Sequence, residues 1–291
     1  MGNKAIRSWV IVIALTGLIV GMTGCETSIV APLQPKERLR VATTTSLYDT
    51  GLWGYLEPKF EEEYGVELDI MYAGTGIALE YGRRGDVDAI TIHSEPREEQ
   101  FVAEGYGVKR VPFAYNYLLI IGPENDPAGI KDMSPENAFK KLMELESAEF
   151  ISRGDNSGTH GKEKAIWQAA GFNYETVQKA GRWYIETGRG MGPTLLMAGE
   201  KGAYTLTDIG TFLAYQGNLD LVPIVDKGDV LLNVYSVIAV NPERHPETNI
   251  QMANNLTDFL ISPEIQELIG DYGVEQYGRQ LFIPCAGTEP K

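Results

Sequence analysis

The chain has 291 residues, of which 43% are hydrophobic and 22% are charged, a composition typical of a folded protein with room for two domains. Its formal net charge is −15, so nucleic acids and anionic membrane surfaces are disfavoured, and no nucleic-acid binding is expected. A small anion is not excluded, because surface carboxylates are screened over roughly 8–10 Å at cellular salt, whereas a buried cleft responds to its own dipoles.

The N-terminus resembles a targeting segment. Two basic residues precede an apolar stretch, 9–20, which is too short for a membrane span and ends in small residues. It leads into Met22-Thr23-Gly24-Cys25, which resembles a lipoprotein processing box. We therefore predict a signal peptide over 1–24, a lipid on Cys25 and a linker over 25–37. The alternative is an uncleaved anchor helix, and both place the folded part on the outer face of the cytoplasmic membrane.

The chain contains two cysteines, Cys25 and Cys285. If Cys25 carries the lipid, Cys285 has no partner, so we predict no disulfide bond. Cys285 follows an apolar segment near the C-terminus and is interpreted as a small packing residue.

Three strand-turn-helix units open the folded part. The first strand, 39–42, runs into Thr43-Thr44-Thr45-Ser46 and then a helix near 52–60. The second strand, 66–72, leads to Gly74-Thr75-Gly76 and another helix, and the third, 88–92, ends at His93. In open α/β sheets, ligands bind outside the carboxyl ends of the strands, so these hydroxyl groups are placed where a ligand would lie.

The apolar run 111–121 is long enough to cross from one domain to another. A helix follows near 135–145, capped by Ser134 with Pro135 at its first position.

The octapeptide Ser152-Arg153-Gly154-Asp155-Asn156-Ser157-Gly158-Thr159 follows a short strand that ends at 151, and a helix is predicted over 162–170. A strand, a turn of small polar residues and a helix start form a nest of backbone N–H donors at the positive end of a helix dipole. The hydroxyls of Ser157 and Thr159 and the guanidinium of Arg153 add further donors suited to a small oxyanion. The alternative is an ordinary helix cap, in which serine and threonine are also common.

Strands and helices continue to alternate. A strand over 182–186 leads to Gly190-Met191-Gly192, and strands over 221–225 and 231–240 return the chain to the first domain. The alternation predicts an α/β fold with a mostly parallel sheet. We predict two lobes, with lobe 1 made of 38–121 plus 229–291 and lobe 2 made of 122–228.

Several of these motifs together resemble one protein family. Thr43-Thr44-Thr45-Ser46, Gly74-Thr75-Gly76, the octapeptide, Gly190-Met191-Gly192 and Leu281-Phe282-Ile283-Pro284 are similar, in order and spacing, to motifs of the tungstate-binding proteins of ABC transporters. The similarity covers about residues 38 to 288. It implies a two-lobed periplasmic-binding-protein fold of type II, with the ligand in a cleft between the lobes. Ile209 departs from the pattern, because an arginine is expected there after Thr207-Asp208. Pro193 supplies no N–H to the turn at Gly190-Met191-Gly192.

The resemblance also implies the ligand-binding residues. Thr44 and Ser46 would donate from lobe 1, and Arg153 and Thr159 from lobe 2. Secondary candidates are Thr45, Thr75, Ser152, Ser157, Gly158 and Gly192. The expected ligand is tungstate or molybdate, with no cofactor and no protein-bound metal ion. The expected partner is the membrane permease of an ABC transporter, and the protein is expected to be a monomer without catalytic activity.

The chemistry of these residues agrees with an oxyanion. Tungstate and molybdate are fully deprotonated near neutral pH, so their site requires donors, which hydroxyl, backbone N–H and guanidinium groups supply. Asp155 is then predicted to pair with Arg153 rather than to touch the anion.

Three alternatives compete with this interpretation. Arg153-Gly154-Asp155-Asn156-Ser157-Gly158-Thr159 is also similar to a stretch of the phosphate-binding proteins, whose protonated ligand benefits from a carboxylate acceptor. Asp155, Ser157 and His160 contain the residue types of a hydrolase triad, but one tight turn rarely provides its geometry, and His160 is predicted to lie on the surface. The aromatic residues Trp53, Trp167 and Trp183 are interpreted as packing residues rather than as a sugar-binding platform.

Overall fold

The computed structural model describes residues 36–290. The predicted signal peptide, the predicted lipidation site at Cys25 and most of the predicted linker lie outside the described residues. The chain from Lys36 onward forms one compact unit. Within the described part of the chain, no helix is both long and apolar enough to cross a membrane.

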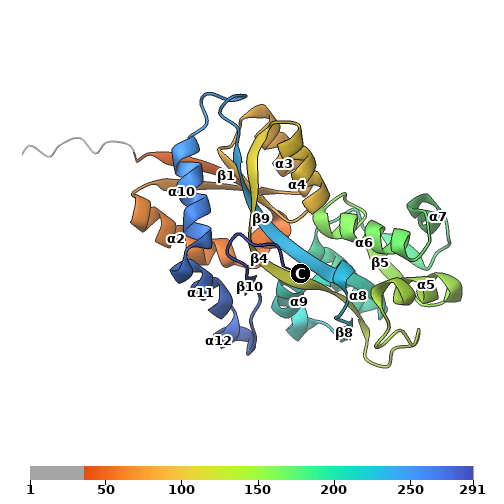
Figure 1. Ribbon diagram of the computed structural model, residues 1–291. Coiled ribbons are helices and arrows are strands. Elements are labelled where there is room, and N and C mark those ends of the chain that lie inside the picture. Colours follow the sequence, from red (N-terminus) through yellow and green to blue (C-terminus); the bar gives the residue numbers. More distant parts are fainter. Residues whose placement is uncertain (1–35, 291) are drawn as a thin grey trace, which may run out of the picture. The chain divides into compact units, whose positions relative to one another are not determined.

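Ten strands form one mixed sheet in the order β2-β1-β3-β9-β4-β7-β5-β6, with β8 and β10 also paired to β4 (Figure 1). Their bounds are β1 (Arg38–Thr44), β2 (Glu67–Ala73), β3 (Ala89–Ile92), β4 (Gly107–Pro123), β5 (Phe150–Ser152), β6 (Tyr184–Glu186), β7 (Tyr204–Asp208), β8 (Leu221–Val225), β9 (Leu232–Val240) and β10 (Ile283–Pro284).

Helices cover this sheet. Their bounds are α1 (Thr45–Asp49), α2 (Leu52–Tyr64), α3 (Thr75–Arg84), α4 (Glu95–Ala103), α5 (Pro135–Leu145), α6 (Gly158–Ala169), α7 (Tyr174–Gln178), α8 (Met191–Lys201), α9 (Ile209–Tyr215), α10 (Ile250–Ile261), α11 (Pro263–Asp271) and α12 (Val274–Tyr277), with 3-10 turns at Gln216–Asn218 and Asp229–Leu231. The predicted start of α5 is confirmed, because the Ser134 side chain accepts a hydrogen bond from the Asn137 N–H and Pro135 opens the helix.

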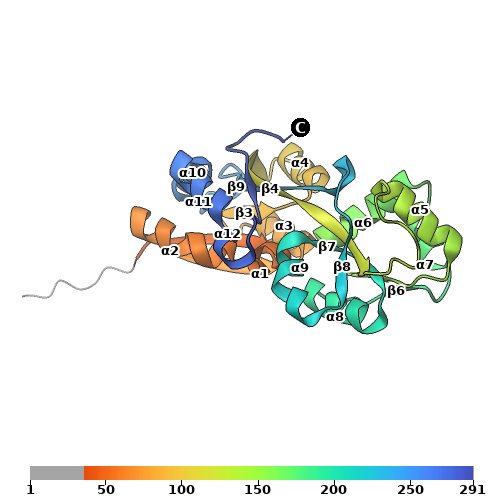
Figure 2. The ribbon, with the colours of Figure 1, turned by 90° about the horizontal axis from the view of Figure 1, so that it is seen from below.

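Strand β4 belongs to two parts of the sheet. Residues 107–117 pair with β9, whereas residues 118–123 pair with β7 and β8. We call the part that contains β1, β2 and β3, with the helices packed on it, the first half. The part that contains β5, β6 and β7, with its helices, is the second half. In Figures 1 and 2, β4 runs from the first half into the second.

Each half has a hydrophobic core on both faces of its sheet. In the first half, one core lies under α2, α10 and α11, and the other lies under α3 and α4. In the second half, Leu118 and Ile120 of β4 face one core, while Leu119 and Ile121 face the other. This alternation follows from the two-residue period of a strand that is buried on both faces. The two halves are thus stabilised by separate cores.

The prediction of a mostly parallel sheet is wrong for the middle of the molecule. β1 runs parallel to β2 and β3, and β5 runs parallel to β6 and β7. Every pairing made by β4 or β9 is antiparallel. The reason is that β4 carries the chain into the second half and β9 carries it back, so the two strands run side by side in opposite directions. The exact lobe boundaries stay a prediction.

Candidate functional site

Polar residues lie together where the first two strands end. Thr44, the last residue of β1, pairs with Ala73, the last residue of β2, because the two strands are parallel and in register. Thr44 Oγ1 accepts a hydrogen bond from the Leu47 N–H at 3.3 Å and so caps α1. Thr75 begins α3 shortly after β2 ends. The predicted residues Thr44, Thr45, Ser46 and Thr75 therefore lie at one edge of the sheet.

A second polar turn lies between β5 and α6 in the second half. Ser152 ends β5, and Ser157 caps α6 by accepting a hydrogen bond from the His160 N–H at 3.2 Å. Gly154 and Asn156 both have positive φ, +61° and +57°, which turns the chain back toward the helix. The helix begins at Gly158, four residues before the predicted start, because the Ser157 cap adds a turn that carries few apolar residues.

Arg153 is held by Asp155, as predicted. Its Nε and Nη2 donate to Asp155 Oδ2 at 3.1 and 2.5 Å, and Asp155 Oδ1 accepts from the Ser157 N–H at 3.1 Å. Burial acts to raise the pKa of Asp155, but the Arg153 charge and the hydrogen bonds from Ser157 and Arg153 outweigh it and lower that pKa below its ordinary value. The Asp155 carboxylate is therefore ionised, and both of its oxygens already accept hydrogen bonds. It fixes the orientation of the Arg153 guanidinium, and only 5% of the Arg153 side chain is exposed.

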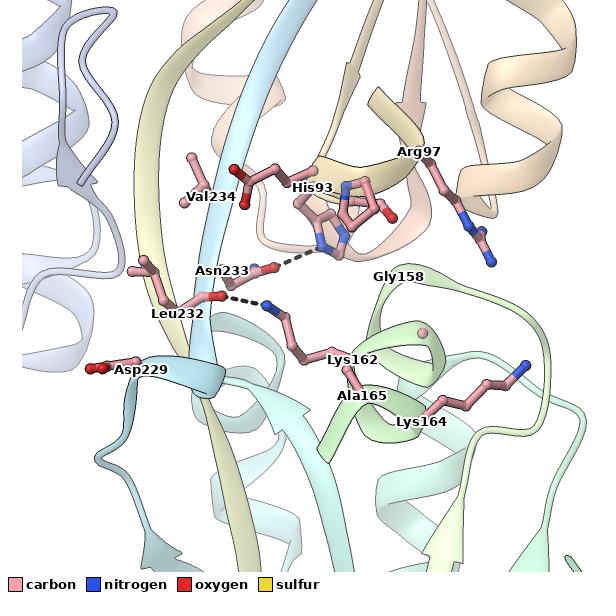
Figure 3. Close-up of a pocket in the computed structure, with 14 residues that line it drawn as sticks. His93, Arg97, Gly158, Lys162, Lys164, Ala165, Asp229, Leu232, Asn233 and Val234 are labelled. Atoms are coloured by element: carbon pink, nitrogen blue, oxygen red, sulfur yellow. Dashed lines mark hydrogen bonds between the residues drawn. The ribbon is translucent and has the colours of Figure 1, made fainter. Parts of the chain in front are cut away.

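The two polar turns approach each other at His93, which follows β3. Ser46 Oγ lies 2.8 Å from His93 Nε2 in the first half. On the other side, a Cβ added to Gly158 would lie only 2.7 Å from His93 Cε1, so the ring packs directly on the start of α6 (Figure 3). Burial is the largest cause that lowers the pKa of His93 to about 4, and the positive charge of Arg153 lowers it further. Residues from both halves thus meet around one histidine.

Two further contacts join the halves beside His93. Arg97 Nη1 of α4 donates to the Asn156 carbonyl at 3.2 Å. Lys162 Nζ of α6 donates to the Leu232 carbonyl at 2.9 Å (Figure 3). A cavity of about 430 Å³ opens next to these contacts between α4, α6 and β9. Its lining includes acidic residues, basic residues and neutral polar residues, among them His93, Glu95, Arg97, Lys162, Lys164, Asp229 and Asn233.

The predicted donors differ in what their side chains already bind. Within the described residues, the buried hydroxyls of Thr75 and Thr159 have no hydrogen-bond partner. The Ser152 hydroxyl donates to Glu163 Oε2 at 2.7 Å, so its proton is committed inside the second half. Gly192, near the start of α8, lies against the Tyr215 hydroxyl of α9, also in the second half. Unpartnered buried hydroxyls are destabilising, so Thr75 and Thr159 have the most to gain from a ligand.

Comparisons with known proteins identify the family to which the chain belongs. Residues 31–264 match the family model described as "PBP superfamily domain". The chain is 41% identical to the tungstate-binding protein TupA of Peptoclostridium acidaminophilum over 284 residues, which cover 95% of this chain and 97% of that protein. It is 42% identical to the putative ABC transporter anion-binding protein of Haloferax volcanii, over 94% of this chain and 84% of that protein. The solved tungstate-binding protein TupA of Desulfovibrio alaskensis G20 is 40% identical, has a TM-score of 0.75, and is matched over 86% of this chain and 99% of its own.

The chain belongs to the tungstate-binding protein family of the PBP superfamily. The predicted periplasmic-binding-protein fold is therefore confirmed.

In this member of the tungstate-binding family, the residues that support the second polar turn were not anticipated from the sequence. Glu163 is buried and accepts hydrogen bonds from Ser152, Trp167 and Tyr184. Burial raises its pKa to about 7, against the effect of these hydrogen bonds. A single glutamate in an otherwise ordinary helical pattern carries no signal of such a role.

The prediction that His160 lies on the surface is wrong. Its side chain is buried, its Nδ1 accepts from the Asn156 N–H at 2.9 Å, and its Nε2 lies 2.6 Å from the Tyr174 hydroxyl. Tyr174 comes from α7, which the sequence pattern did not reveal. The ring nitrogens therefore support the turn and do not face Ser157 or Asp155, so the Ser/His/Asp triad is not formed.

The remaining predictions concern packing and metals. Trp53, Trp167 and Trp183 are buried, as predicted for packing residues. Cys285 is half-buried, and burial raises its pKa to about 11, so it is a packing residue and not a reactive thiol. No group of three or more histidine, cysteine, aspartate or glutamate side chains in residues 36–290 is placed to hold a metal ion.

Proposed function

We propose that this protein captures a tetrahedral oxyanion, tungstate or the similar molybdate, between its two halves. The observation that supports this most is the approach of two donor-rich turns, one after β1 and one before α6, around His93. The proposed donors are Thr44, Thr45, Ser46 and Thr75 from the first half and Ser152, Arg153, Ser157, Gly158, Thr159 and Gly192 from the second. The tungstate-binding relatives support the same ligand.

The donor set is sufficient for tight binding. Arg153 at about 4 Å from a unit negative charge would contribute roughly 4 kcal/mol at an effective dielectric constant of 20. Each hydrogen bond to a charged group adds about 1.5–3 kcal/mol. Several such bonds, less the free energy of closing the two halves, reach the roughly −12 kcal/mol of a nanomolar complex.

Phosphate is the alternative anion, and its proton requires an acceptor in the site. Asp208 is within electrostatic range of Arg153, but both of its carboxylate oxygens accept hydrogen bonds from Thr211, at 2.8 and 2.7 Å. Asp49 is also in range of Arg153, but its side chain is exposed. Neither carboxylate is well placed to accept the proton of hydrogen phosphate, which favours the fully deprotonated anions.

The same proposal includes delivery to a membrane transporter. The protein would be secreted through its predicted signal peptide, 1–24, and tethered by a lipid on Cys25 to the outer face of the cytoplasmic membrane. As a monomer, it would hand the anion to an ABC-transporter permease without chemical change.

Isothermal titration calorimetry of the purified protein with tungstate, molybdate, sulfate and phosphate tests the proposed ligand. The expected result is tight, one-to-one binding of tungstate or molybdate with weak or no heat from phosphate and sulfate. Heat from phosphate alone would establish the alternative, and heat from none of the four anions would contradict an oxyanion-binding function.

A further inference from the structure

A chain of side-chain hydrogen bonds runs from the predicted site into the strands that join the halves. Asn116 of β4 donates its Nδ2 to the Leu281 carbonyl at 3.3 Å, and Asn233 of β9 donates its Nδ2 to Asn116 Oδ1 at 3.0 Å. Asn233 Oδ1 lies 2.8 Å from His93 Nδ1 (Figure 3). On the other side of the ring, His93 Nε2 lies 2.8 Å from Ser46 Oγ. This series of hydrogen bonds ends at the backbone carbonyl of Leu281. The polar side chains of Asn116, Asn233, His93 and Ser46 are each at least nine-tenths buried.

The donor and acceptor roles along this series of hydrogen bonds determine where each proton lies. Because Asn233 uses its amide N–H toward Asn116, it presents its oxygen to His93, so His93 Nδ1 carries the proton and donates. The neutral ring then has an unprotonated Nε2, which accepts. Ser46 Oγ also lies 3.4 Å from Thr44 Oγ1, but its 2.8 Å contact with His93 Nε2 is the shorter of the two, so we assign the single Ser46 proton to His93.

A bound dianion would compete for that proton. A hydroxyl that contacts the anion donates to it, because a hydrogen bond to a charged oxygen is stronger than one to a neutral nitrogen. Ser46 has one proton and cannot donate it in both directions. If Ser46 turns to the anion, His93 Nε2 becomes a buried acceptor without a donor, which is unfavourable. Protonation of Nε2 removes this conflict, since the new N–H donates to a lone pair of Ser46 Oγ.

We propose that anion binding is coupled to the uptake of one proton by His93, which acts as a positioning residue for the Ser46 hydroxyl. The proton comes from solvent and is released again with the anion, so no covalent bond to the anion forms or breaks. The inference rests on the proposed function, because it requires Ser46 to face the ligand.

The charges around His93 set the direction of the coupling. Burial is the largest cause that lowers the pKa of His93 to about 4. The positive charges of Arg153, in the turn before α6, and of Lys162, on α6, also disfavour protonation of His93. From β9, the facing groups are the Asn233 amide and the Tyr235 ring, whose centroid lies 5.1 Å from that of the histidine.

The charged groups of the adjoining cavity complete this environment. They are Glu95 and Arg97 of α4, Lys164 of α6 and Asp229 of the 3-10 turn before β9. A dianion next to Arg153 offsets the positive charges of Arg153 and Lys162, so it raises the pKa of His93 and draws a proton to it.

Calorimetry tests this coupling in the purified full chain. Tungstate is titrated at about pH 7 in two buffers that differ in ionisation enthalpy, and the difference in heat gives the number of protons taken up. The expected uptake approaches one proton per anion. His93→Gln preserves a side chain that donates and accepts but cannot be protonated, so its uptake should fall to near zero. His245→Gln is the matched control, because His245 contacts the Arg83 carbonyl on the outer surface of the first half, and its uptake should equal that of the wild type.

The outcomes separate the coupling from the proposed function. Tungstate binding without proton uptake in the wild type would overturn the coupling and leave the function standing, whereas absence of binding would overturn the function. Proton uptake that persists in His93→Gln would assign the proton to another group and overturn the role of His93.

If His93→Gln does not fold, the wild type alone decides. Its dissociation constant for tungstate should fall by up to about tenfold per unit as pH is lowered from about 8 to about 6, in the range where the anion stays deprotonated. A constant value across that range would contradict the coupling.

Discussion

At the scale of single residues, Arg153 is the only cation among the proposed donors, and Asp155 holds its guanidinium in one plane. We expect Arg153→Ala to weaken tungstate binding at least tenfold, because it removes a charge worth roughly 4 kcal/mol at close range. Arg153→Lys should retain part of the affinity, since the charge remains but the planar fork is lost. Calorimetry measures both variants, and wild-type affinity in Arg153→Ala would remove this residue from the site.

Thr159 offers a test that separates binding from stability. Its buried hydroxyl has no partner within the described residues, so Thr159→Val should raise the free energy of unfolding by up to about 1 kcal/mol. The same change should weaken tungstate binding about ten- to hundredfold, because a hydrogen bond to a charged oxygen is lost.

Thr205→Val is the matched control for Thr159. The Thr205 hydroxyl is also buried but donates to the Ile151 carbonyl at 2.7 Å, so its removal should lower stability and leave binding unchanged. Denaturant unfolding and calorimetry measure the two effects. Unchanged affinity in Thr159→Val would show that this hydroxyl does not contact the anion.

Sequence reasoning succeeded where a residue's role depends on its neighbours in the chain. The Arg153–Asp155 pair and the Ser134 cap of α5 are of this kind. It failed for His93 and His160, because their partners come from strands and helices that are distant in sequence, and a lone histidine carries no sign of them.

At the scale of secondary-structure elements, the start of α6 touches the first half through a glycine. A Cβ on Gly158 would lie 2.7 Å from His93 Cε1 and 3.0 Å from its Nδ1, and the buried ring is held by hydrogen bonds on both sides. We expect Gly158→Ala to push the halves apart and to weaken tungstate binding at least tenfold.

Gly161→Ala, in the same helix, provides the control for this contact. A Cβ there would meet nothing within 4 Å, so this variant should bind normally and be slightly more stable, because alanine favours helix. Calorimetry and thermal unfolding compare the two variants. Equal affinities would contradict a close contact between the halves at Gly158.

The packing of α6 on β5 and β6 predicts a pH dependence of stability. Burial raises the pKa of Glu163 to about 7, so the folded state keeps a proton that the unfolded chain loses. The contribution of Glu163 to the free energy of unfolding therefore falls as pH rises from about 4.5 to about 7. His93 and His160 act in the opposite direction between about pH 4 and 6.5, because their pKa values are lowered to about 4.

Glu163→Gln removes the glutamate contribution alone. Its free energy of unfolding should rise more steeply with pH between about 4.5 and 6.5 than that of the wild type. Denaturant unfolding at a series of pH values measures the difference between the two proteins. Parallel curves would show that the pKa of Glu163 is the same in the folded and the unfolded protein.

Most elements could be predicted from periodicity, including α5, which spans Pro135–Leu145 where a helix was expected near 135–145. The direction of the strands in the middle of the sheet could not. Whether β9 pairs antiparallel with β3 and β4 depends on how the chain returns between the halves, and the alternation of strands and helices does not encode that.

At the scale of the whole molecule, an acidic protein is proposed to bind a dianion. Loss of the predicted signal peptide, with Lys4 and Arg7, would change the net charge from −15 to −17. The surface charge is screened over roughly 8–10 Å, whereas most of the proposed donors are buried. The separate cores of the two halves allow each to stay intact while the distance between them changes.

The most direct test of binding between the halves is to locate tungsten in crystals of the complex by anomalous diffraction at a tungsten absorption edge. We predict one strong peak whose surrounding oxygens lie about 2.7–3.2 Å from donors of both halves, with Thr44 or Ser46 on one side and Arg153 and Thr159 on the other. A tungsten peak that contacts residues of only one half, or that lies in the cavity beside Lys162 and Asp229, would contradict it.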